Sequence, residues 1–354
     1  MSPLSGVRTA SALKCPLCGH EGVLAYESLR DRLYGVPGHW NFMQCRGCEM
    51  FWLHPRPVLQ DISNCYPDQY FTHQAGGALT LGRSEWVQKL RGTVLNQFFK
   101  YRHLDEFDRI YWLMSRVMMR IPFFRQKLTM GLEALLIPYC PNGRLLDVGC
   151  GNGTYLGLMK SLGWDVAGVE IDAKAAASTK SRLGVFVHNG TLEDGPFDEG
   201  SFDVITMTHV IEHVLDPVQF LRLGARFLKP GGQILIVTPN GRSLGRQLFK
   251  RDWYALDPPR HISLFTPRSI TICLDQTGVL SPLRVRTSTR IACKIARKWL
   301  LVRRTGQFRD EMDNEALAQR WQARLAGRLF QLCEELGNSV LCWGEEIECI
   351  AIRA

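Results

Sequence analysis

Short apolar runs alternate with amphipathic segments in the second half of the chain. Four such runs place apolar residues between turn residues: LLDV (145–148), the run of WDVAGVEID that ends at Glu170, SFDVITMT (201–208) and ILIVTPN (234–240). Runs of this length are typical of buried strands. Because the helical sequence TYLGLMKSLG follows the first of them, the pattern predicts an α/β fold.

Two helix starts carry clear capping residues. Asp172 precedes the alanine-rich segment AKAAAS, and Thr266 precedes Pro267. Aspartate and threonine side chains accept hydrogen bonds from free amides of the first turn, and proline is favoured at the first helical position. A long excursion (241–265) connects the strand that ends at Asn240 to the helix whose cap is Thr266. It leaves the carboxyl end of a strand, so we expect it to face the ligand crevice.

Length and composition indicate an ordinary globular protein. The 354 residues favour two domains, and 45% hydrophobic residues suffice for a sizeable core. The N-terminus MSPLSGVRTASAL lacks the pattern of a signal peptide, and no apolar stretch reaches the ~18 residues of a membrane-spanning helix. Eight of the twelve cysteines have no framework spacing, which suits a reducing cytoplasm. We therefore expect a cytoplasmic protein.

The net charge of +9 resides in one segment. Nine Lys or Arg and no acid lie between Asp275 and Asp310, and the remainder of the chain is neutral. Basic and apolar residues fall on different helical faces here. This is typical of a helix on an anionic membrane surface, of a grip on a pyrophosphate-bearing substrate, or of a solvated charged face. We expect a local anionic partner, with peripheral membrane contact through 290–304 as one form of it.

Four cysteines near the N-terminus form two CxxC pairs. KCPLCGHEG and MQCRGCEMF contain Cys15, Cys18, Cys45 and Cys48. Two such knuckles can give four thiolates to one tetrahedral zinc, and a closed set of four leaves no open coordination position. The spacing therefore predicts a structural zinc, with four reduced thiols or a redox dithiol as alternatives.

A glycine turn follows the first buried strand. LLDVGCGNG places Asp147 two residues before Gly149, Gly151 and Gly153, and an acid, Glu170, follows about 20 residues later. Dinucleotide sites need GxGxxG beside a pyrophosphate, whereas S-adenosylmethionine has no phosphate and tolerates an acid near the turn. The turn therefore favours S-adenosylmethionine.

Consecutive segments of the chain resemble the motifs of class I S-adenosylmethionine-dependent methyltransferases. They are LLDVGCGNG, VAGVEID, NGTLEDGPFDEGSFDVITMTHVIEHVLDP, FLKPGGQILIVTPN and the final GEEIECIAIRA. The CxxC pairs, FWLHPRP and YPDQYF resemble the N-terminal zinc-binding region of a bacterial subgroup that often modifies sugars, polysaccharide precursors or secondary metabolites. The resemblance implies a Rossmann-like, doubly wound, seven-stranded core with an antiparallel last strand, a zinc-ribbon-like module and helical insertions.

The resemblance implies a division of the chain and a set of cofactor contacts. It implies a zinc-binding module at 1–75, a helical linker or lid at 76–138, and a methyltransferase domain at 139–354 with an insertion at about 288–340. The expected cofactor-binding residues are Asp147, Gly149, Gly151, Gly153, Glu170, Ile171, Thr191, Leu192 and Thr208. The family often has aspartate where Thr191 stands, and Glu193 is an acid that could substitute.

Three histidines are candidate catalytic bases. His209 and His213 follow the SFDVITMT strand near the methyl-donating end of the cofactor, and His261 lies in DPPRHISLFTP of the excursion. Histidine has an ordinary pKa near ~6.5, which suits removal of a hydroxyl proton. Each also has a purely structural interpretation. A resemblance to ubiquinone-pathway O-methyltransferases adds a catalytic metal, through His209, Glu212 and His213, as an alternative.

The predicted function is methyl transfer from S-adenosylmethionine to a hydroxyl or carbon of a small molecule. Where amine methylases often carry Asn-Pro-Pro-aromatic, this chain has Thr208-His209-Val210-Ile211, which favours oxygen or carbon acceptors. A sugar, a polysaccharide precursor or a secondary metabolite is the expected acceptor, with a nucleotide- or lipid-linked form left open, and nucleic acid is not expected as a partner. Two alternatives remain open: an RNA methyltransferase that grips RNA with the zinc module and basic segment, or a non-catalytic binding protein.

Overall fold

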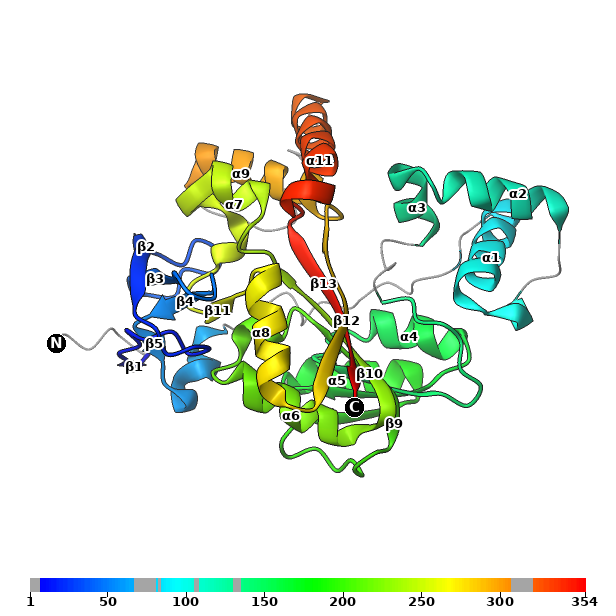
Figure 1. Cartoon of the computed structure of the whole chain (residues 1–354), viewed down its shortest axis with the longest axis horizontal. Coiled ribbons are helices and arrows are strands. Elements are labelled where there is room, and N and C mark those ends of the chain that lie inside the picture. The colour runs from blue at the N-terminus through cyan, green and yellow to red at the C-terminus, as the bar shows by residue number, and fades with distance from the viewer. Residues whose placement is uncertain (1–6, 67–80, 82–83, 105–107, 130–134, 307–320) are drawn as a thin grey trace.

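The computed structural model describes residues 7–66, 81, 84–104, 108–129, 135–306 and 321–354. Its centre is a seven-stranded sheet in the order β12-β13-β10-β9-β6-β7-β8 (Figure 1). The strands are β6 (Arg144–Val148), β7 (Asp165–Glu170), β8 (Phe186–Asn189), β9 (Phe202–Thr208), β10 (Leu228–Pro239), β12 (Leu280–Ser288) and β13 (Glu346–Arg353).

Five neighbouring strands of this sheet run parallel: β10, β9, β6, β7 and β8. Strand β13 lies antiparallel to both β10 and β12. This confirms the predicted Rossmann-like sheet with an antiparallel last strand. The apolar runs that predicted the strands are buried on both faces, as expected when helices cover a parallel sheet.

Helices cover both faces of this sheet. They are α4 (Thr154–Ser161), α5 (Ala173–Leu183), α6 (Pro217–Phe227) and α8 (Pro267–Thr277). Neighbouring strand residues enter opposite cores because side chains alternate along a strand. Leu145 packs in a cluster with Leu156 of α4, whereas Leu146 packs in a cluster with Leu221 of α6 and Ile270 of α8.

Both predicted helix starts are confirmed. The Asp172 side chain accepts from the amide of Ala175 at the start of α5. Thr266 and Ser269 form a capping box at the start of α8, with Pro267 in the first turn.

The N-terminal module (residues 7–66) forms a second, four-stranded sheet in the order β11-β4-β3-β2. Its strands are β2 (Gly22–Leu29), β3 (Trp40–Cys45) and β4 (Phe51–His54), with a separate pair of β1 (Thr9–Ala10) and β5 (Arg56–Pro57) and the short helix η1 (Leu59–Cys65). The edge strand β11 (Ser263–Leu264) comes from the excursion after β10 and pairs with β4. The excursion thus completes the sheet of the module.

The remaining elements are helical. The helical arm comprises α1 (Glu85–Phe99), η3 (Arg102–Leu104), α2 (Arg109–Met118) and α3 (Pro122–Leu128) and lies on the far side of the molecule from the N-terminal module (Figure 1). The excursion contributes α7 (Leu244–Phe249), η5 (Lys250–Asp252) and η6 (Tyr254–Leu256), η4 (Ile211–His213) follows β9, and α9 (Ala292–Thr305) and α11 (Trp321–Leu341) lie between β12 and β13. Among the helices of the described residues, none combines the length and hydropathy that crossing a bilayer requires.

Candidate active site

The glycine turn lies at the carboxyl end of β6. Gly149, Gly151 and Gly153 have φ angles of 72°, 52° and 66°, a region that glycine adopts without steric cost. A Cβ atom on Gly149 would lie 2.6 Å from Val210, and one on Gly153 would lie 2.3 Å from Thr179, whereas one on Gly151 would meet nothing within 4 Å. The turn is therefore closely packed at its two ends and open in the middle, where a ligand can approach the backbone.

Glu170 ends β7 beside this opening. Its carboxylate accepts from the amides of Gly151 (2.7 Å) and Asp172 (2.9 Å), and burial raises its pKa. The next residue, Ile171, is 74% exposed, an unusual exposure for a large apolar side chain at the end of a buried strand. An acceptor carboxylate beside an exposed apolar side chain fits a ribose diol and the face of an adenine ring.

Asp147 lies beneath the turn. Its carboxyl group is buried and accepts from the Thr206 hydroxyl at 2.6 Å, and burial raises its pKa to about 7. Asp147, a predicted cofactor-binding residue, therefore has its carboxyl group buried beneath the open part of the turn. Thr208, at the end of β9, is half-buried and pairs with Val237 of β10.

The predicted adenine edge follows β8. Thr191 is exposed, and its amide and hydroxyl both donate to Asp194, at 2.7 and 2.9 Å. The acid that bonds Thr191 is thus Asp194 and not Glu193. The Leu192 side chain is buried in the core, so only its main chain can face a ligand.

His209 is held between two buried carboxylates. Its Nδ1 lies 3.1 Å from Glu212 and its Nε2 lies 3.0 Å from Glu346 of β13. Burial lowers the pKa of His209, but the bonds to both glutamates outweigh it and bring the pKa to about 9. Glu346 also accepts two bonds from Arg290, and the pKa values of Glu212 and Glu346 fall to about 2 although burial opposes this. His209 is therefore a clamped cation at neutral pH.

His213 and His261 form a pair in which both Nδ1 atoms face main-chain carbonyls. His213 Nδ1 lies 2.9 Å from the Arg260 oxygen and His261 Nδ1 lies 2.7 Å from the Ala255 oxygen. A carbonyl oxygen only accepts, so each Nδ1 carries a proton and donates it to its carbonyl. The ring centroids are 4.8 Å apart, and burial and the neighbouring His261 lower the pKa of His213 to about 4. His213 is therefore a neutral imidazole at neutral pH, with the lone pair on Nε2.

The structure changes the composition of the candidate catalytic metal site. Glu212, His213 and His261 can each offer one ligand atom, and these atoms lie within 4.8 Å of one another. His209, which the sequence placed in such a site, has both ring nitrogens on carboxylates. Metal-bound histidines usually donate their other N–H to a carbonyl or carboxylate, as the Nδ1 atoms of His213 and His261 do.

The N-terminal module supplies residues to this cluster that sequence reasoning missed. The Tyr66 hydroxyl lies 3.0 Å from His213 Nδ1. Asp31 bonds Arg260 twice, at 2.7 and 2.8 Å, and neither side chain is exposed. The main chain of Ile262 donates to Glu212 and accepts from Leu53. FWLHPRP and YPDQYF, noted for their resemblance, contain Leu53 and Tyr66, whereas no pattern marked Asp31.

Aromatic and basic residues singled out in the sequence are engaged within the protein. Trp253 is buried and donates to Glu345 at 2.7 Å, and Lys298 lies over the Tyr254 ring. In the basic segment, Ile295 and Ala296 of α9 pack into a core cluster with Trp253. The apolar face of α9 is therefore covered by the protein itself, and membrane contact through 290–304 stays a prediction.

The four N-terminal cysteines lie together. Their sulfur atoms are within 4.8 Å of one another, with 3.5 Å between Cys15 and Cys48 and 3.3 Å between Cys18 and Cys45. The Cys48 amide points at the Cys45 sulfur, at 3.4 Å. The cluster fits a tetrahedral metal with thiolate ligands.

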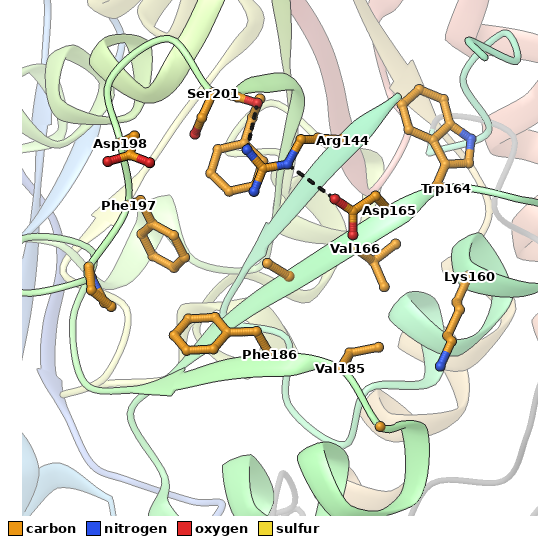
Figure 2. Close-up of a pocket in the computed structure, with 14 residues that line it drawn as sticks. Arg144, Lys160, Trp164, Asp165, Val166, Val185, Phe186, Phe197, Asp198 and Ser201 are labelled. Carbon is orange, nitrogen blue, oxygen red and sulfur yellow. Dashed lines mark hydrogen bonds and ion pairs between the residues drawn. The ribbon is translucent and has the colours of Figure 1, made fainter. Parts of the chain in front are cut away.

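A cavity lies at the opposite edge of the sheet. Figure 2 shows this pocket of about 460 Å³, in which Arg144 bonds Asp165 and Ser201 and in which Phe186 and Phe197 lie. Arg144, Asp165 and Phe186 are the first residues of β6, β7 and β8. Because open α/β sheets bind ligands at the carboxyl ends of strands, this pocket is not the cofactor site.

Comparison with known proteins finds similarity to methyltransferases. Residues 124–279 match a family model described as a methyltransferase domain. A probable S-adenosylmethionine-dependent methyltransferase of Mycolicibacterium smegmatis is 34% identical over 102 residues, which are 28% of this chain and 40% of that protein. A ubiquinone biosynthesis O-methyltransferase of Parvibaculum lavamentivorans is 29% identical over 217 residues, 57% of this chain and 81% of that protein.

A solved S-adenosylmethionine-dependent methyltransferase from Mesorhizobium loti has 17% sequence identity and a TM-score of 0.41, covering 61% of this chain and 94% of that one. The chain spans less than half the length of several curated relatives that it matches. The matched family model is thus a methyltransferase domain, and these two curated relatives are S-adenosylmethionine-dependent or ubiquinone-pathway methyltransferases. Their names do not point to one common acceptor.

Proposed function

We propose that this protein transfers a methyl group from S-adenosylmethionine to a hydroxyl group of a small molecule such as a sugar, a polysaccharide precursor or a secondary metabolite. The observation that carries the proposal is the pair of His213 and His261, which follow β9 and lie in the excursion and whose Nδ1 atoms both face main-chain carbonyls. Carbon acceptors remain compatible with the fold, but two imidazoles whose ligand atoms lie within 4.8 Å of Glu212 favour an acceptor that must lose a proton.

The residues of the candidate site have different roles because they differ in position and in protonation state. When bound, S-adenosylmethionine supplies a methyl group on a sulfonium, which is already an activated leaving group. With the cofactor bound, Glu170 would accept from the ribose hydroxyls, and the open amide region at Gly151 would admit the cofactor. Nε2 of His213 or His261 would take the O–H proton of the acceptor, and the cofactor would supply the methyl group and leave as a neutral thioether. Glu212 would stabilise the resulting imidazolium.

His209 has a positioning role in this scheme. Because its two nitrogens bond Glu212 and Glu346, His209 fixes the Glu212 carboxylate beside His213 and His261. Thr238 holds the other oxygen of Glu212 at 2.9 Å. A divalent cation held by Glu212, His213 and His261 would instead lower the pKa of a bound acceptor hydroxyl at the same place.

We also propose that Cys15, Cys18, Cys45 and Cys48 hold one structural zinc. Their spacing, their mutual proximity and the amide that points at Cys45 support a closed four-thiolate site. Such a site stabilises a small module and takes no part in the chemistry.

Two measurements test the proposal. Calorimetry should show S-adenosylmethionine binding that Glu170→Gln weakens at least ten-fold, whereas Glu193→Gln, an exposed acid near the adenine edge, should leave it within two-fold. Candidate hydroxyl acceptors should gain one CH₂ by mass spectrometry. His213→Asn and His261→Asn should each lower kcat by ~10²–10⁴ while cofactor binding persists. Wild-type turnover in both histidine variants would exclude the base role.

A further inference from the structure

Helix α11 carries a long apolar stripe on its outward face. Six large apolar side chains are 49–81% exposed, and we call them the leucine stripe: Trp321, Leu325, Leu329, Leu332, Leu336 and Val340. With 3.6 residues per turn, they fall within about a third of the helix circumference. A continuous exposed stripe of this kind marks an interaction surface.

The opposite face of α11 is packed against the protein. Ala323, Gly327 and Glu334 are buried. A Cβ atom on Gly327 would lie 2.7 Å from the sulfur of Cys293 in α9, and Phe330 packs on Phe249 of α7. The helix is therefore fixed by one side while the leucine stripe points away from the body, and α11 projects from the edge of the molecule in Figure 1.

The spacing of the leucine stripe is symmetric about the middle of the helix. The midpoint lies between Phe330 and Gln331, and each stripe residue has an apolar counterpart at the same distance on the other side. The counterparts are Trp321 and Val340, Leu325 and Leu336, and Leu329 and Leu332. In an antiparallel pair of identical helices related by a two-fold axis, each stripe residue would meet its counterpart, so the surface is self-complementary.

Charges beside the stripe fit the same arrangement. Arg328 and Glu335 lie on one flank of the stripe, one before and one after the midpoint. In a two-fold antiparallel pair, Arg328 of each copy lies near Glu335 of the other, which gives two symmetric ion pairs. A helix that lies on an anionic membrane would instead carry Lys and Arg along both flanks.

We propose that α11 is a dimerisation helix whose leucine stripe pairs antiparallel with the same stripe of a second copy of this chain. A single helix pair buries less area than the interfaces above 2,000 Å² that are typical of obligate dimers. The dimer is therefore reversible, and its fraction rises with protein concentration in the micromolar range.

Sedimentation velocity of the full-length protein over a range of concentrations tests this proposal. The wild type should shift from monomer to dimer, and the double variant Leu329→Asp/Leu332→Asp should stay monomeric with an unchanged melting temperature, because both side chains are exposed. Leu248→Asp, on the exposed face of α7, is the matched control and should dimerise as the wild type does.

Charge reversal tests the antiparallel register. Arg328→Glu and Glu335→Arg should each weaken the dimer at least ten-fold, and the two together should restore it. A wild type that stays monomeric at all concentrations would overturn the proposal. So would a dimer that survives Leu329→Asp/Leu332→Asp, a double reversal that restores nothing, or a stripe that binds phosphatidylserine vesicles and no second copy.

Discussion

The three histidines of the candidate site differ because their partners differ. His209 lies between two carboxylates, which favour its charged form, whereas His213 and His261 face carbonyls and each other. An imidazolium has no lone pair to accept a proton, so His209 is the least suited of the three to act as base. His261, one of the three candidate bases, thus pairs with His213 and leaves His209 outside the pair.

The pH dependence of stability should report His209. Its pKa of about 9 is above the ordinary value near 6.5, so its stabilising contribution is complete below pH 6.5 and is lost as the pH rises through about 9. His209→Gln should therefore cost about 1–2 kcal/mol at pH 6, a figure discounted for a ring that is 38% exposed, and close to nothing at pH 10.

Urea unfolding at both pH values measures this difference. His39→Gln changes an exposed histidine that bonds only Ser28 among the described residues, and should cost less than ~0.5 kcal/mol at either pH. If the difference between wild type and His209→Gln grows with pH, the clamped-cation assignment is wrong.

At the scale of elements, β11 joins two parts of the chain that are far apart in sequence. It pairs with β4, and the neighbouring Arg260 forms a buried ion pair with Asp31, 229 residues away. Arg260 also bonds both oxygens of Asp257, so loss of Asp31 would leave the guanidinium with one carboxylate partner and with unsatisfied buried N–H groups, at a cost of about 1–3 kcal/mol. The Arg260–Asp31 pair therefore fixes the excursion to the N-terminal module.

Asp31→Asn tests this link. It should lower the free energy of unfolding by about 1–3 kcal/mol, because Asp31 accepts from Arg260 and from three amides of its own turn, those of Leu33, Tyr34 and Val36, and Asn retains only one acceptor oxygen. Glu199→Gln removes an exposed ion pair with Arg226 and should cost less than ~1 kcal/mol. Equal losses in the two variants, measured by urea unfolding, would show that the buried pair contributes no more than a surface one.

This element also shows how far sequence predicts the structure. The strands, the glycine turn and the caps at Asp172 and Thr266 depend on local patterns, and the structure confirms them. The pairings of Arg260 with Asp31 and of His209 with Glu346 depend on long-range topology. No local spacing or periodicity signals which aspartate or glutamate a distant strand will bring to a histidine, so these partners could not be predicted.

At the scale of the whole molecule, the N-terminal module contributes residues to the candidate site. Tyr66 reaches His213, and the main chain of Leu53 donates to Ile262, which in turn donates to Glu212. In contrast, Gly151 in the turn after β6 and Glu170 at the end of β7 bond each other, away from the described contacts of the module. Catalysis and cofactor binding should therefore respond differently to loss of the module's structure.

Removing the proposed zinc tests whether methyl transfer and cofactor binding respond differently. The purified protein should contain one zinc per chain by elemental analysis. Chelation should lower the rate of methyl transfer at least ten-fold, because the β4–β11 pairing that holds His261 loosens. S-adenosylmethionine binding by calorimetry should change less than three-fold. Cys18→Ser should reproduce the chelated state, whereas Cys333→Ser, an exposed cysteine of α11, should keep both the zinc and the activity. Full turnover without zinc, or equal loss of cofactor binding and turnover, would show that the module does not act through the histidine pair.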